Sequence, residues 1–133
     1  MKAVKEKTKG VVLVIDDDTL VRRMLCAALN KMEFETIEAP TGVSGLLEYK
    51  KCKPGIVITD LMMPDGNGFE TILKIRAEDP DVRIIAMSSG GSSNDGDFLE
   101  ATRELGARAT IRKPFTVEDV RQALAVALKD SVK

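Results

Sequence analysis

Short apolar runs alternate along this chain with segments of helical spacing, and this alternation restricts the fold more than any other feature. The runs occupy five ranges: 11–15, 35–39, 56–59, 83–87 and 109–112. Runs of this length bounded by turn residues are typical of strands. Because a helix connects each strand to the next, every connection returns the chain to the same edge of the sheet, and the strands are parallel. The sequence therefore predicts an α/β fold, a (βα)5 doubly wound five-stranded parallel sheet in the flavodoxin-like order 2-1-3-4-5.

Polar residues mark where the expected helices begin. The first helix starts after Asp18 or Thr19, either of which can accept the free amides of the first turn. Thr41 caps the second helix, which should bury Val43, Leu46 and Leu47. Thr116 and Asp119 form a capping box for the last helix. Its buried stripe should comprise Val117, Val120, Leu124 and Leu128.

Two segments are expected to be loops. Residues 90–96, GGSSNDG, are small and polar, so we expect them to be the most mobile part of the chain and a place of state-dependent change. The run 66–68, GNG, is expected to form a tight turn, because it lacks the lysine and the length of a phosphate-binding loop.

Length and charge exclude several classes of function. The 133 residues suit one domain, with a basic tail at 1–10 and the folded unit at 11–130. The 20 basic and 21 acidic residues and the 4% aromatic content provide neither a basic face nor stacking platforms, so no direct nucleic acid binding is expected. The apolar run 11–15 is too short for a membrane span or a signal peptide, so we expect a cytoplasmic protein without membrane insertion.

Five polar residues follow the apolar runs. Asp16 and Asp17 follow the first, Asp60 the third, Ser88 the fourth and Lys113 the fifth. Because the carboxyl ends of parallel strands share one edge, these side chains should meet near the switch point between the first and third strands. The sequence thus predicts a cluster of three carboxylates, a hydroxyl and an ammonium, which is a set suited to phosphoryl chemistry.

The three carboxylates predict a bound cation. Two like charges about 4 Å apart repel by roughly 4 kcal/mol at an effective dielectric near 20. Clustered carboxylates therefore favour a hard divalent ion, and Mg²⁺ is the expected one. A carboxylate is also a competent nucleophile toward phosphorus, and phosphoryl transfer needs little beyond positioning and charge neutralisation.

At this point the motifs resemble those of a known family. DD at 16–17, ITDLMMPDGNGF at 58–69, Ser88 and KPF at 113–115 resemble the receiver domain of two-component response regulators. The resemblance covers residues 11 to about 129. It implies that Asp60 is the phosphoacceptor. It also implies that Asp17, Asp60 and the backbone carbonyl of Met62 bind Mg²⁺, while Asp16 acts through a metal-bound water.

The resemblance also implies roles on the phosphoryl side of the site. Lys113 would pair with one phosphoryl oxygen and Ser88 would donate a hydrogen bond to another, and the Lys113-Pro114 bond would be cis. At Thr110 the sequence departs from the family, which usually carries a Tyr or Phe that rotates as a switch. We therefore expect coupling between Ser88 and the surface of the fourth helix, fifth strand and fifth helix to differ from the usual switch.

The function implied is signalling. A sensor histidine kinase or phosphotransfer protein would donate a phosphoryl group to Asp60, and the domain would then act on a downstream effector protein. A homodimer through the surface of the fourth helix, fifth strand and fifth helix is a further expectation. Such a domain is not an enzyme beyond its own phosphotransfer and dephosphorylation. It would be either a stand-alone receiver or one domain of a larger regulator.

Other interpretations of the same residues remain. The residues at 16–18 could simply cap the first helix, and Arg22 and Arg23 are expected to be solvated, although such positions can touch a kinase. Thr110 leaves open a degenerate receiver used only for protein binding. The motif DDDTL at 16–20 also resembles haloacid-dehalogenase-type phosphatases, with Asp16 as the nucleophile and Asp18 as the acid/base, although Thr19 stands one position early for that motif.

Overall fold

The computed structural model describes residues 10–63, 66–88 and 95–129. Within these ranges one sheet of five parallel strands has the order β2-β1-β3-β6-β7. Its strands are β1 (Val11–Ile15), β2 (Glu35–Ala39), β3 (Ile56–Asp60), β6 (Arg83–Ser88) and β7 (Ala107–Arg112). The helices are α1 (Thr19–Lys31), α2 (Gly42–Cys52), α3 (Gly68–Glu78), α4 (Asp95–Glu104) and α5 (Val117–Leu128). The predicted fold and the order 2-1-3-4-5 are confirmed.

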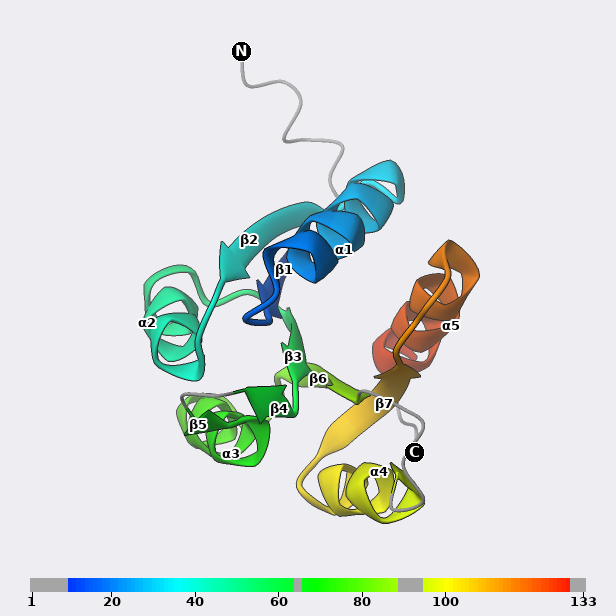
Figure 1. Cartoon of the computed structure of the whole chain (residues 1–133). Helices are drawn as coiled ribbons and strands as arrows, with labels where there is room; N and C mark the ends of the chain where they lie inside the picture. Colours follow the sequence, from blue (N-terminus) through cyan, green and yellow to red (C-terminus); the bar gives the residue numbers. More distant parts are fainter. Residues whose placement is uncertain (1–9, 64–65, 89–94, 130–133) are drawn as a thin grey trace.

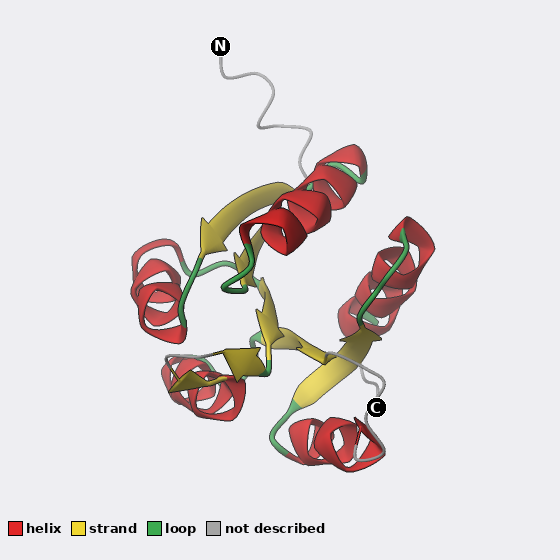
Figure 2. Ribbon diagram, viewed as in Figure 1, coloured by secondary structure: helices red, strands yellow, loops and turns green. Residues whose placement is uncertain are grey.

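The sheet lies between two layers of helices, as Figures 1 and 2 show, and a hydrophobic core fills the space on each of its faces. Helices α1 and α5 cover one face, and α2, α3 and α4 cover the other. Alternate residues of β1 enter different cores because successive side chains of a strand point to opposite faces. Val12 and Val14 pack in the core shared with α1 and α5. Leu13 and Ile15 pack in the core shared with α2 and α3.

The predicted inner face of α2 is right only for Leu46, which packs against the core and is partly buried. Val43 and Leu47 are 69% and 62% exposed, whereas Gly45 and Tyr49 are buried. The reason is the close approach of α2 to the sheet. A Cβ atom on Gly45 would lie 2.5 Å from Cδ1 and 2.8 Å from Cγ1 of the buried Ile15, so a larger residue would force the packing at this contact to shift. Gly45 and Tyr49 are four residues apart and set the buried stripe, which turns Val43 and Leu47 outward.

The predicted helix caps are confirmed. Asp18 accepts hydrogen bonds from two amides of the first turn of α1, and Thr41 caps α2. Thr116 and Asp119 form the reciprocal capping box of α5. The expected stripe of α5 is right only in its middle. Val120 and Leu124 are buried together with Ala123 and Ala127, while Val117 and Leu128 are 49% and 41% exposed.

Several boundaries differ from the predicted ones. Asp60 and Ser88 are the last residues of their strands, and β7 begins two residues earlier than expected. Residues 95 and 96 of the expected loop 90–96 are the first turn of α4, and the rest of that loop lies outside the described residues. Instead of forming a turn, β5 (Gly66–Asn67) pairs antiparallel with β4 (Met62–Met63). The basic tail lies outside the described residues except for its last position.

Tyr49 provides a test of how α2 is held. Its ring is fully buried, and its hydroxyl donates a hydrogen bond to Asp79 Oδ2 at 3.0 Å. Burial, followed by this hydrogen bond, raises the pKa of Tyr49 to about 12. In the unfolded chain, the tyrosine hydroxyl ionises near pH 10. The neutral phenol therefore stabilises the fold fully below pH 10, and this contribution is lost as the pH rises toward 12.

We expect Tyr49→Phe to lower the free energy of unfolding by about 1 kcal/mol at neutral pH, because the ring still packs but the hydrogen bond is lost. The difference in the free energy of unfolding between wild type and variant should shrink between pH 10 and 12. Urea denaturation at several pH values measures it. Tyr49 is the only tyrosine and the chain has no tryptophan, so tyrosinate absorbance follows this residue alone. A normal tyrosine titration in the folded protein would contradict the prediction.

Candidate functional site

The polar residues predicted at the strand ends come together at the carboxyl edge of the sheet. Carboxylate oxygens of Asp16, Asp17 and Asp60 lie within 4.8 Å of one another. Lys113 Nζ is 2.9 Å from Asp16 Oδ2 and 3.3 Å from Asp60 Oδ2. The backbone N–H of Lys113 donates to the carbonyl of Ser88 at 2.8 Å, which ties the last two strand ends together. The predicted cluster is therefore present.

Asp16 is the most firmly held carboxylate. The residue is fully buried, and its backbone N–H donates to the carbonyl of Ala39 at 3.1 Å. Its Oδ1 accepts a hydrogen bond from the backbone N–H of Asp18 at 2.9 Å. Its Oδ2 pairs with Lys113 but accepts no aligned hydrogen bond within the described residues. Asp17, in contrast, is exposed at the mouth of the cluster.

Burial and mutual repulsion set the electrostatics of the cluster. Burial raises the pKa of Asp60, Lys113 opposes this effect, and the neighbouring Asp16 adds to it. Burial alone would lower the pKa of Lys113, but Asp16 and Asp60 together outweigh it and raise that pKa. Lys113 is therefore a firm cation that faces two carboxylates. Three carboxylates against one ammonium leave an excess of negative charge in a confined space.

The donor set fits a hard divalent cation. All three side chains offer carboxylate oxygens, which Mg²⁺ and Ca²⁺ prefer, and the excess negative charge needs a counter-ion. Met62 lies beside the cluster, where its backbone N–H donates to Asp60 Oδ1 at 3.4 Å. The use of its carbonyl as a metal ligand stays a prediction.

Ser88 carries a buried hydroxyl at the end of β6. The residue is 3% exposed, and its Oγ has no hydrogen-bond partner among the residues that the structure describes. Buried polar groups are normally paired, so an unpaired one calls for a missing partner. Thr110 does not lie at this strand end. It pairs with Ala86 in the sheet and is half-buried, two residues short of the position opposite Ser88.

Comparison with known proteins identifies the family to which the chain belongs. The family model described as "Response regulator receiver domain" matches residues 12–125. The chain belongs to this family. Chemotaxis protein CheY of Listeria monocytogenes serovar 1/2a is 34% identical over 118 residues, which cover 88% of this chain and 97% of that protein. Sporulation initiation phosphotransferase F of Bacillus subtilis is 29% identical over 85% of this chain and 89% of that protein.

A solved structure agrees with this assignment. The chemotaxis response regulator CheY4 of Vibrio cholerae superposes on this receiver with a TM-score of 0.82 at 25% sequence identity, covering 91% of this chain and all of that one. Membership of the receiver family disfavours the phosphatase interpretation of residues 16–20. No helix in the described part of the receiver has the length and apolar character needed to cross a membrane.

Two residues of the receiver site were missed by the sequence interpretation. Arg22 is not solvated: its side chain is 11% exposed, and Nη1 donates to the backbone carbonyl of Asp16 at 2.6 Å. Its spacing of four residues from Asp18 could have placed it on the helix face above the site. Gly68 packs directly against the backbone of Asp60, and no local pattern in a single sequence indicates such a contact. The Lys113-Pro114 bond is cis, as the resemblance implies.

Proposed function

We propose that this receiver accepts a phosphoryl group on Asp60 from a phosphohistidine of a sensor histidine kinase or phosphotransfer protein. One observation carries the proposal. A buried carboxylate at the end of β3 faces an ammonium 3.3 Å away, and the next strand ends in a buried hydroxyl that has no hydrogen-bond partner within residues 10–63, 66–88 and 95–129. An incoming phosphoryl group would offer the hydroxyl an acceptor, and it would bring further anionic oxygens to the ammonium, which otherwise pairs with Asp16 and Asp60.

The transfer follows from this arrangement. A carboxylate oxygen of Asp60 attacks phosphorus, and the new O–P bond forms as the P–N bond to the donor imidazole breaks, with the electron pair left on nitrogen. Lys113 pairs with one phosphoryl oxygen, and Ser88 donates its O–H to another. Attack by water later releases inorganic phosphate and restores the carboxylate. The domain therefore catalyses only its own phosphorylation and dephosphorylation.

The metal expected here is Mg²⁺. Asp17, Asp60 and the carbonyl of Met62 would hold it directly, with Asp16 acting through a water. When bound, the ion neutralises negative charge on the phosphoryl oxygens. Asp16 Oδ2 lies 2.9 Å from Lys113 Nζ, and this ion pair would hold the ammonium near the acceptor.

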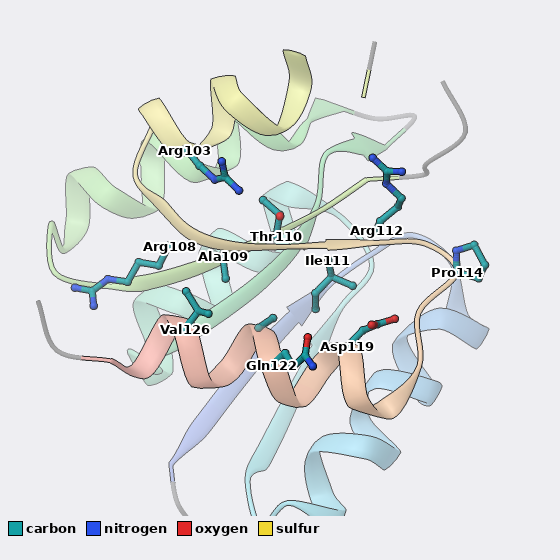
Figure 3. Close-up of a pocket in the computed structure, with 11 residues that line it drawn as sticks. Arg103, Arg108, Ala109, Thr110, Ile111, Arg112, Pro114, Asp119, Gln122 and Val126 are labelled. Atoms are coloured by element: carbon teal, nitrogen blue, oxygen red, sulfur yellow. The ribbon is translucent and has the colours of Figure 1, made fainter. Parts of the chain in front are cut away.

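The surface formed by α4, β7 and α5 is our candidate for the output. It contains an open groove of about 460 Å³, shown in Figure 3. Thr110 lies in the groove, with Arg103 of α4 on one side and Gln122 of α5 on the other. We infer that phosphorylation changes the affinity of this surface for a downstream effector protein, with a second copy of the chain as the alternative occupant. We further infer that residues 11–130 form the domain and that it acts in the cytoplasm.

Incubation with acetyl phosphate tests the acceptor. We expect wild type to gain one phosphoryl group on Asp60 only when Mg²⁺ is present, as read by intact mass and site mapping. Asp60→Asn should gain none, because an amide is not a nucleophile toward phosphorus. Asp81→Asn is a matched control, since it changes an exposed carboxylate outside the cluster and should behave as wild type.

Two other results would contradict phosphorylation on Asp60, and each would favour a different alternative. An adduct on Asp16 would support the phosphatase interpretation, and wild type without an adduct would support a binding-only receiver. Amide NMR spectra of the same samples test the output surface. Phosphorylation should shift the signals of Thr110, Gln122 and Ala123, and shifts confined to the strand ends would place the output elsewhere.

A further inference from the structure

Arg22 joins three separate parts of the chain. Its Nη1 donates to the carbonyl of Asp16 at 2.6 Å, and its Nε pairs with Glu38 Oε1 of β2 at 3.0 Å. Its Nη2 donates to Thr19 Oγ1 at 3.3 Å. The guanidinium group therefore lies between the residue that follows β1, the first turn of α1 and the strand at the edge of the sheet. With only 11% of the side chain exposed, this is a fixed contact.

The contact holds the peptide unit between Asp16 and Asp17. The N–H of Asp16 is bound to the carbonyl of Ala39, and its own carbonyl is bound to Arg22. Ala39 and Glu38 are neighbours on β2, so the same strand positions both ends of residue 16. Because a peptide unit is planar, fixing the Asp16 carbonyl also fixes the direction in which the chain continues into Asp17.

Arg22 could affect a bound cation in two opposite ways. Its positive charge would repel the ion, whereas its hydrogen bond would hold two of the three carboxylates in place. The Glu38 carboxylate 3.0 Å from Nε largely cancels the charge. The pairing with Glu38 does not weaken the hydrogen bond from Nη1 to the Asp16 carbonyl. The positioning effect therefore outweighs the repulsion.

We propose that Arg22 is a positioning residue for the acidic cluster, which through the Asp16 carbonyl keeps Asp16 and Asp17 in the arrangement that binds Mg²⁺. This inference rests on the proposed function, because it concerns the metal of that site. Residues that orient metal ligands typically change metal affinity by about 10- to 100-fold when they are replaced. Arg22→Gln should therefore raise the dissociation constant for Mg²⁺ by about tenfold.

Titration calorimetry with magnesium chloride on the full chain tests the proposal. Arg23→Gln is the matched control, since it removes the same charge from an exposed neighbour on α1 and should leave the dissociation constant within about twofold of wild type. Arg22→Lys keeps the charge but not the planar fork, and we expect an intermediate value. Thermal unfolding of each variant without metal confirms that it is folded and separates a loss of stability from a loss of Mg²⁺ affinity.

A folded Arg22→Gln that binds Mg²⁺ as tightly as wild type, or more tightly, would overturn the proposal. If Arg22→Gln does not fold, Arg22→Lys decides in its place, and wild-type affinity in that variant would overturn the proposal as well. The role of Arg22 and the proposed function are tested by different results. A wild type that binds Mg²⁺ but accepts no phosphoryl group would overturn the proposed function alone.

Discussion

Replacing Asp60 by Asn is expected to stabilise the folded chain when no divalent cation is present. The reason is that the Asp60 carboxylate is buried, and Asp16, with which it shares one ammonium, disfavours its charge further. Burial raises the pKa of Asp60, which shows that its ionised form is disfavoured in the fold. The folded state is therefore more stable at low pH, where Asp60 is protonated. This stability is lost as the pH rises above the ordinary carboxyl pKa and Asp60 ionises.

Asparagine keeps the shape of the side chain and removes the charge. We expect the free energy of unfolding of Asp60→Asn at neutral pH to exceed that of wild type by about 1–3 kcal/mol, because the cost of burying the charge, together with repulsion from Asp16, is only partly offset by the pairing with Lys113. Urea denaturation measures this difference, with a metal chelator present to remove divalent cations. Asp81→Asn, on an exposed turn, should differ from wild type by less than about 0.5 kcal/mol.

Addition of Mg²⁺ should reverse this order. A ligand that binds only the folded state stabilises it by about 2.7 kcal/mol at 100 times its dissociation constant, and wild type binds the ion more tightly than a variant that has lost one carboxylate. If Asp60→Asn were instead less stable than wild type in chelator, attraction to Lys113 would dominate the cluster. The description of the site as a repulsive cluster that needs a cation would then be wrong.

Gly68→Ala is expected to damage both stability and phosphoryl acceptance. A Cβ atom at this position would lie 2.3 Å from the carbonyl oxygen of Asp60 and 2.7 Å from Cα of Leu61. Both are backbone atoms, so no side-chain rotation can relieve the contact. The Gly68 N–H also donates to the carbonyl of Leu61 at 3.0 Å, which holds α3 against the end of β3. The added methyl group must therefore push α3 away or move Asp60.

We expect Gly68→Ala to lower the free energy of unfolding by about 3 kcal/mol, which is at the upper end for an overpacked site. The rate of phosphorylation by acetyl phosphate should fall by about 100-fold, because a displacement near 1 Å at a reacting group has effects of that size. Gly55→Ala is the matched control, since nothing lies within 4 Å of a Cβ atom built there. Equal stability and equal rates in the two variants would show that Gly68 does not constrain Asp60.

The positions of the strands and the members of the acidic cluster could be predicted because both depend on local patterns. A strand between two helices must run parallel to its neighbours, so a polar residue at the end of each apolar run reaches the same edge of the sheet. Asp16, Asp60 and Lys113 were found in this way. Helix caps such as Thr41 were predictable for the same reason, since a cap involves residues only a few positions apart.

Contacts between segments that are distant in the sequence could not be predicted. Gly45 is buried because α2 approaches Ile15, and the same approach turns Val43 and Leu47 to the solvent against their hydrophobic character. Arg22 has the local sequence context of a surface charge, but Glu38 and the Asp16 carbonyl lie within 3.0 Å of its guanidinium group. The sequence alone determined the order of the elements and which charges gather at one edge, because these follow from periodicity and chain direction. Only the tertiary structure decided which backbone atoms hold those charges, because that depends on how closely separate segments pack.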